Sequence, residues 1–98
     1  MKQVRMTRVY LDWINALRDG AARARIQVRV DRLVHGNPGQ SRYLGQGVSE
    51  LKIDGGPGYR VYYCELDGEF IVLLAGGDKS TQPQDVKLAF ALSESIED

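Results

Sequence analysis

The stretch FIVLLAGGDKSTQ, residues 70–82, decides how the rest of the chain is arranged. Its apolar first half, residues 70–75, predicts a buried strand. Thr81, Gln82 and Pro83 are helix-start signals, so we expect a helix over residues 85–96. Between the two elements, Lys79 and its polar neighbours put a cation and several hydrogen-bonding groups at the end of a strand. That placement indicates a site.

The residues before this stretch have the pattern of strands. Leu51 and Ile53 alternate with polar residues, and residues 59–66 form a second strand-like segment. The GGPG segment at residues 55–58 predicts a turn, and Asp67-Gly68 is a hairpin signal. Together with residues 70–75 these segments predict an antiparallel meander.

The N-terminal part has helical periodicity. Residues 4–6 can form a short first strand, after which Thr7 can cap a helix that runs to Leu17. Asp19 can cap a second helix that ends at His35-Gly36, where glycine suits the position after the C-cap. Two consecutive helices with a short turn predict a helical hairpin.

We therefore expect one domain over residues 1–98 in the order β-α-α-β-β-β-α. This is an α+β fold with a small, mostly antiparallel sheet. The N-terminal helical hairpin and the C-terminal helix pack on one face of this sheet. The composition, 43% hydrophobic and 27% charged, is that of a globular chain. No segment has the pattern of a signal peptide or a membrane span, and Cys64 is the single cysteine, so a cytoplasmic protein with no membrane partner is expected.

The zero net charge conceals two halves of opposite sign. Residues 1–42 hold nine Lys and Arg against three Asp, a net charge of +6, and residues 43–98 hold four against ten, a net charge of −6. Arginine pairs with phosphate through two parallel hydrogen bonds, so the basic half suggests an anionic partner. The alternative is a solvated helix face that the acidic half balances. Arg25, Arg29 and Arg32 share one face of the second predicted helix and are candidate RNA-binding residues.

Strand alternation gathers the other candidate residues. If their neighbours face the core, Glu50, Lys52, Arg60 and Tyr62 lie together on the open face of the sheet, and Lys79 arrives at the end of the next strand. Lys52, Arg60 or Lys79 alone would indicate only a solvated surface residue. Their combination with the turn at residues 76–82 predicts a cationic, concave site without metal ligands.

Such a site can cleave RNA without a metal or cofactor, because the ribose 2′-hydroxyl attacks its own phosphate. Arg60 suits the neutralisation of the developing charge. Lys52 is the better proton acceptor, provided that its surroundings favour the neutral amine. Lys79 can hold the phosphate, while Gln82 and Tyr62 can contact or stack on a base. Lys52, Arg60 and Lys79 are thus the catalytic candidates.

Several segments carry a resemblance to a known family, namely residues 13–19, 24–26, 45–53, 58–62 and 76–82. In them the chain resembles the RelE/ParE superfamily of small bacterial toxins, and within it the phage Gp49-like, HigB-related addiction module killer group. Arg60 matches the strand arginine of RelE-type toxins, Lys52 a strand lysine, and Lys79 the basic residue after the last core strand. The chain lacks the Tyr or His that HigB-like toxins carry near the C-terminus, which puts a scheme using those side chains in doubt.

The resemblance implies the toxin of a type II toxin-antitoxin system, a ribosome-dependent mRNA endonuclease that inhibits translation. Its implied partners are the ribosome, mRNA and a cognate antitoxin, commonly a helix-turn-helix DNA-binding protein, with operator DNA reached only through the antitoxin. The alternative is a ParE-like poison of DNA gyrase that has no chemistry of its own.

Overall fold

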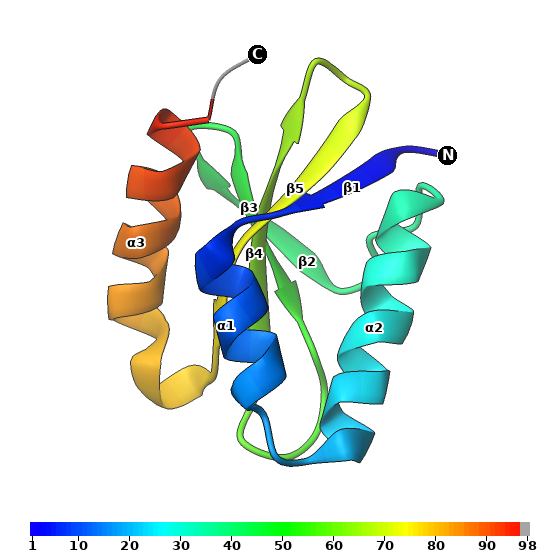
Figure 1. The fold of residues 1–98 in the computed structure, drawn as a ribbon, viewed down its shortest axis with the longest axis vertical. Coiled ribbons are helices and arrows are strands. Elements are labelled where there is room, and N and C mark those ends of the chain that lie inside the picture. Colours follow the sequence, from blue (N-terminus) through cyan, green and yellow to red (C-terminus); the bar gives the residue numbers. More distant parts are fainter. Residues whose placement is uncertain (97–98) are drawn as a thin grey trace.

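The computed structural model describes residues 1–96, and Figure 1 shows its arrangement. The elements are β1 (Gln3–Met6), α1 (Arg8–Ala16), α2 (Gly20–Val34), β2 (Ser41–Gly45), β3 (Val48–Lys52), β4 (Arg60–Leu66), β5 (Phe70–Gly77), the 3₁₀ turn η1 (Lys79–Thr81) and α3 (Gln82–Glu94). The strands form one sheet in the order β1-β5-β4-β3-β2, in which only the β1–β5 pair is parallel. The predicted α+β fold with a mostly antiparallel sheet is confirmed. No helix within residues 1–96 is long and apolar enough to cross a membrane.

The predicted ends of the two N-terminal helices are confirmed. Thr7 and Asp19 cap α1 and α2 by accepting hydrogen bonds from backbone N–H groups of the first turn. His35 is the C-cap of α2, and Gly36 follows it with φ 92°, a left-handed conformation that glycine adopts without strain. These caps fix where the chain leaves each helix.

The sequence-based prediction missed the edge strand β2. It pairs with β3 in a hairpin whose turn residues, Gln46 and Gly47, have φ of 51° and 82°. Arg42 and Tyr43 in this strand are both exposed. The apolar alternation that would have predicted the strand is therefore missing.

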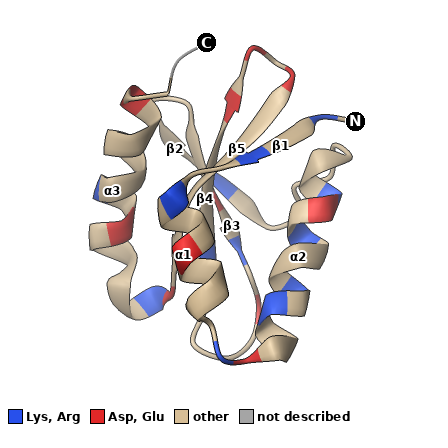
Figure 2. Ribbon diagram, viewed as in Figure 1, with Lys and Arg blue, Asp and Glu red and all other residues tan. Residues whose placement is uncertain are grey.

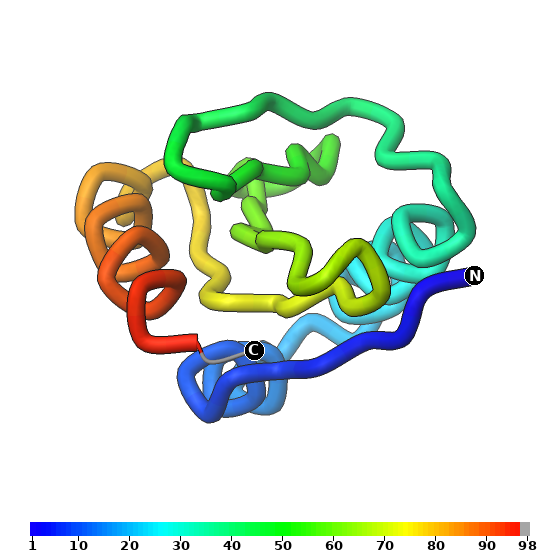
Figure 3. Tube along the Cα trace, turned by 90° about the horizontal axis from the view of Figure 1, so that it is seen from above, coloured from blue at the N-terminus to red at the C-terminus, as the bar shows by residue number. Residues whose placement is uncertain are grey.

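Helices cover both faces of the sheet, so the expectation of one open face is wrong. Tyr10 of α1 and Ile26 and Val30 of α2 join one buried cluster on the first face. Ala89 of α3 joins a second buried cluster on the other face, together with Tyr62. Figure 3 shows α3 and α2 on opposite sides of the strands. The molecule is a three-layer arrangement with the sheet in the middle.

Gly76 and Gly77 allow helices to approach β5 from both sides. A Cβ atom at Gly76 would overlap the indole ring of Trp13 in α1, and one at Gly77 would overlap the carboxylate of Asp85 in α3. The Trp13 ring is itself packed between two tyrosine rings, at centroid distances of 5.8 and 6.2 Å. Helix packing thus accounts for both glycines.

Asp78 caps the turn η1, which leads from β5 into α3. Its Oδ1 accepts hydrogen bonds from Ser80 N at 2.8 Å and from Ser80 Oγ at 2.5 Å, while Asp78 N donates to Thr81 Oγ1 at 3.3 Å. The bonds from Ser80, that of its hydroxyl first, lower the pKa of the Asp78 carboxyl. This cap determines where the backbone of Lys79 lies.

We expect Gly76→Ala to lower the free energy of unfolding by about 1–3 kcal/mol, because the new methyl group must displace Trp13 from its packed position. The matched control is Gly20→Ala at the exposed first residue of α2, where the nearest atom would lie 3.6 Å away. Urea unfolding of both variants measures the effect. Equal free energies of unfolding for the two variants would contradict this account of Gly76.

Asp78 should make stability depend on pH. Because its pKa in the folded state lies below the ordinary value of 3.8, the ionised carboxylate stabilises the fold above pH 3.8, and this contribution is lost as the pH falls through the folded-state pKa. Asp78→Asn should therefore be less stable than wild type at neutral pH, by an amount that shrinks in acid. Urea unfolding over a pH series tests this, and a difference that stays constant would disprove it.

Candidate functional site

The three predicted catalytic residues line one pocket of about 380 Å³. Lys52 is the last residue of β3 and pairs across the strands with Arg60, the first residue of β4. Lys79 is the first residue of η1, two positions after the end of β5, and is exposed, whereas Lys52 and Arg60 are half-buried. The structure thus brings the three cations together at one end of the sheet. Their chemical roles stay a prediction.

The turn at residues 54–58 forms a wall of this pocket. Pro57 O accepts a hydrogen bond from Lys79 N at 3.3 Å, and Gly58 O accepts one from Arg60 Nη1 at 3.0 Å. Gly58 has φ 77°, and a Cβ atom there would lie 3.4 Å from both Arg60 Nη1 and Lys79 Cβ. Glycine at this position lets the turn hold both cationic segments.

A buried carboxylate, which the sequence-based prediction placed on an open face, lies behind Arg60. Glu50 is fully buried beneath α3, and its Oε1 is 3.4 Å from Arg60 Nε and accepts a hydrogen bond from Gln82 Nε2 at 2.7 Å. Its Oε2 is 3.8 Å from Nε of Arg42, whose side chain is 62% exposed. Glu50 therefore connects β3 to β2, β4 and α3. The sequence does contain a feature that predicts this burial. The C-terminal helix has an apolar side at Val86, Ala89 and Phe90, and this side must pack against a face of the sheet.

Tyr62 does not lie where it was predicted. Its side chain is fully buried beneath α3, so in this structure the ring offers no surface on which a base can stack. Burial, followed by the charges of Glu50 and Asp85, raises the pKa of Tyr62, against the opposing effect of Arg60. Gln82 is half-buried, and its amide nitrogen is bound to Glu50. Both residues belong to the support of the pocket rather than to its open surface.

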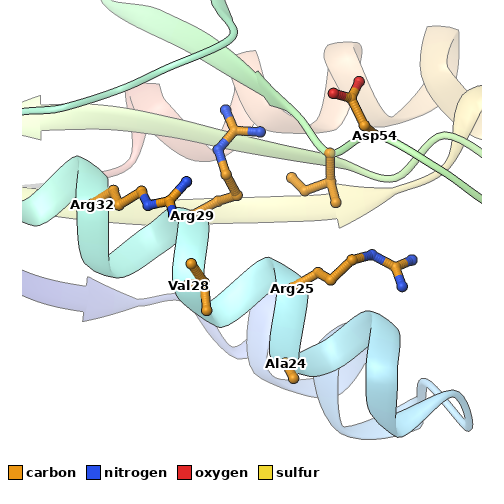
Figure 4. Close-up of a pocket in the computed structure, with 7 residues that line it drawn as sticks. Ala24, Arg25, Val28, Arg29, Arg32 and Asp54 are labelled. Carbon is orange, nitrogen blue, oxygen red and sulfur yellow. The ribbon is translucent and has the colours of Figure 1, made fainter.

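The three predicted RNA-binding arginines line a second pocket, of about 360 Å³, along α2 (Figure 4). Ile53 and Asp54 border this pocket and the first one, so the two adjoin. The side chain of Arg29 donates hydrogen bonds to the carbonyls of Lys52, Pro38 and Gln40, and these bonds fix the position of that side chain. Arg25 and Arg32 are exposed, and their side chains make no hydrogen bond within residues 1–96.

The charge asymmetry seen in the sequence is visible on the fold. Figure 2 shows basic residues along α2 and acidic residues on the hairpin between β4 and β5. Within residues 1–96 only Lys2–Glu65 and Arg42–Glu50 pair a cation of the first 42 residues with an acid, at 2.9 and 3.8 Å. Among the described residues, therefore, the arginines of α2 form no ion pairs with the acidic half.

Two other chemical possibilities find little support. Burial raises the pKa of the Cys64 thiol, which disfavours the reactive thiolate. Within the described part of the chain no three His, Cys, Asp or Glu side chains gather in a way that could hold a metal ion. The adjoining cationic pockets are the remaining candidate site.

Comparison with known proteins gives a relative in sequence and a solved structure with a similar fold. No family model matches the sequence. An uncharacterized protein of Haemophilus influenzae is 40% identical over 94 residues, which cover 96% of this chain and 95% of that protein. The structure of a mutant of the E. coli toxin RelE in the free state superposes with a TM-score of 0.68 at 13% identity, over 88% of this chain and 95% of RelE. The chain therefore belongs to the same family as the Haemophilus influenzae protein, and its fold is RelE-like.

Proposed function

We propose that this protein is the toxin of a type II toxin-antitoxin pair and that it cleaves mRNA on the ribosome. We further place it in the Gp49-like, HigB-related group of such toxins. The observation that carries the proposal is the convergence of Lys52, Arg60 and Lys79, from three different strand ends, on one pocket. The fold, which is similar to that of a protein described as a toxin, supports it.

In the proposed reaction the ribose 2′-hydroxyl attacks the adjacent phosphorus, and the bond from phosphorus to the 5′-oxygen of the next nucleotide breaks. The products are a 2′,3′-cyclic phosphate and a 5′-hydroxyl, whose oxygen takes its proton from water. Arg60 would stabilise the charge that develops on the phosphoryl oxygens, because the guanidinium stays protonated. Lys52 lies beside it across the strands and would receive the proton of the 2′-hydroxyl. Lys79, the exposed member, would hold the phosphate and favour its in-line orientation.

The second pocket would extend the contact with RNA. Arg25 and Arg32 are exposed on α2, and their pocket shares Ile53 and Asp54 with the first one. Cations arranged next to a cleavage site can bind successive phosphates of a message or of ribosomal RNA. Arg29 would contribute by holding the intervening backbone rather than by contacting phosphate.

An RNA-cleaving toxin needs a partner that restrains it in the cell that makes it. We propose a cognate antitoxin in the cytoplasm, of the helix-turn-helix DNA-binding kind, which would connect the toxin to operator DNA. Covering the two adjoining pockets, or blocking their entry into the ribosome, would suffice for inhibition. An acidic segment would complement the unpaired arginines of α2.

Lys79→Ala tests the proposal with the least disturbance of the fold, because Lys79 is exposed. We expect it to lower cleavage of a translated reporter message on the order of 100-fold, as for the loss of one group that stabilises transition-state charge. Primer extension after brief expression measures the cuts. The matched control is Lys87→Ala, an exposed lysine of α3 outside both pockets, which should cleave like wild type.

The same message without a start codon provides the test of ribosome dependence, and it should stay intact. Cuts in the untranslated message would contradict ribosome dependence, and full cleavage by Lys79→Ala would contradict the assigned site. Growth arrest by wild type without any cuts would exclude the nuclease and favour a binding target such as DNA gyrase.

A further inference from the structure

Glu50 is the one charged residue that is fully buried within residues 1–96. Removing a carboxylate from water costs several kcal/mol unless hydrogen bonds and charges replace the lost hydration. Here the replacement is incomplete, because Oε2 accepts no hydrogen bond from the described residues. An apolar side chain of similar volume would fit the cluster of Val48, Tyr62 and Leu74 at less cost. Stability alone therefore does not explain a carboxylate at this position.

The position of Glu50 relative to Arg60 gives another explanation. Arg60 Nε lies 3.4 Å from Glu50 Oε1 in an ion pair without a hydrogen bond, while Arg60 Nη1 donates to the carbonyls of Gly58 at 3.0 Å and Tyr59 at 3.4 Å. Among the hydrogen bonds within residues 1–96, none uses Nη2 of Arg60. Since the guanidinium is planar and rigid, contacts along Nε and Nη1 fix the whole group. Nη2 is left for a ligand of the pocket that Arg60 lines.

Gln82 extends the same arrangement to the third cation of the pocket. It is the first residue of α3, three positions after Lys79, and its amide bonds to Glu50 Oε1 at 2.7 Å. The carboxylate thus contacts Arg60 directly and reaches the segment of Lys79 through one side chain. A single buried group therefore relates the positions of two cations that come from β4 and from η1.

We propose that Glu50 is a positioning residue, which fixes the guanidinium of Arg60 for contact with the scissile phosphate while itself remaining beneath α3, out of reach of substrate. This inference rests on the proposed function. It adds a buried acid to a site whose exposed residues are cationic. The ion pair orients Arg60 through Nε, and loss of the carboxylate charge would allow the guanidinium to rotate away from its productive orientation.

The first test observes Arg60 directly and needs no enzymatic activity. The Nε–Hε signal of Arg60 in a nitrogen-15 NMR spectrum is assigned by its disappearance in Arg60→Lys. In Glu50→Gln its exchange with water should be on the order of tenfold faster, because the charge that holds Nε in a buried ion pair is lost. An unchanged exchange rate would overturn the proposal.

The second test uses cleavage rates at saturating ribosome-bound message. Glu50→Gln should lower kcat about 10-fold to 100-fold with little change in KM, since a misplaced group of this kind costs up to about 100-fold. In the Arg60→Lys background the same substitution should have less than about a twofold effect, because its effect acts through Arg60. A purely structural role would instead give the same fold-loss in both backgrounds, and this result would overturn the proposal.

Two further variants keep the tests decisive. Should Glu50→Gln not fold, Glu50→Asp retains the charge but withdraws it by one methylene, and an intermediate loss of kcat is expected. Glu65→Gln, at an exposed residue of β4, is the matched control and should leave kcat unchanged. If Lys79→Ala lowers cleavage while Glu50→Gln does not, only the positioning role fails. If wild type cleaves no message, the proposed function fails and the positioning role fails with it.

Discussion

The close approach of two helices to the end of β5 is the constraint on which the rest of this structure depends. Gly76 admits Trp13 of α1 on one face, and Gly77 admits Asp85 of α3 on the other. Because neither position has a side chain, the helices lie close enough to the strand to bury apolar clusters on both faces. A sheet covered on both faces has no open surface on which a site can form.

The pockets consequently lie at one end of the sheet rather than on its face. Lys52, Arg60 and Lys79 all belong to that end, where β3 stops, β4 begins and the chain leaves β5. The turn at residues 54–58 holds the segments of Arg60 and Lys79 through backbone carbonyls. The cationic residues are therefore placed by strand ends and a turn whose positions the core fixes.

The sequence was sufficient for much of this arrangement and insufficient for the rest, for physical reasons. Capping residues and glycine positions act locally, so Thr7, Asp19 and Gly36 could be interpreted without tertiary information. Strand alternation correctly placed Lys52 and Arg60 next to each other, because register follows a period of two. Whether their face of the sheet is covered depends on where a distant helix packs, and alternation carries no such information.

The residues that sequence reasoning misjudged are those that α3 covers. Glu50 and Tyr62 lie on the same face as Lys52 and Arg60, yet α3 buries the first two completely and leaves the others half-accessible. The charge of Glu50 therefore predicts, wrongly, that its side chain is exposed. Groups from other elements, rather than water, contact the carboxylate. The guanidinium of Arg60 lines the pocket and forms an ion pair with this carboxylate, so we infer that the buried charge serves to complete the orientation of that guanidinium. In the site that we propose, the buried acid supports three cations, of which Lys79 is exposed and Lys52 and Arg60 are half-buried. Composition and charge pattern indicated only the cationic part of this arrangement.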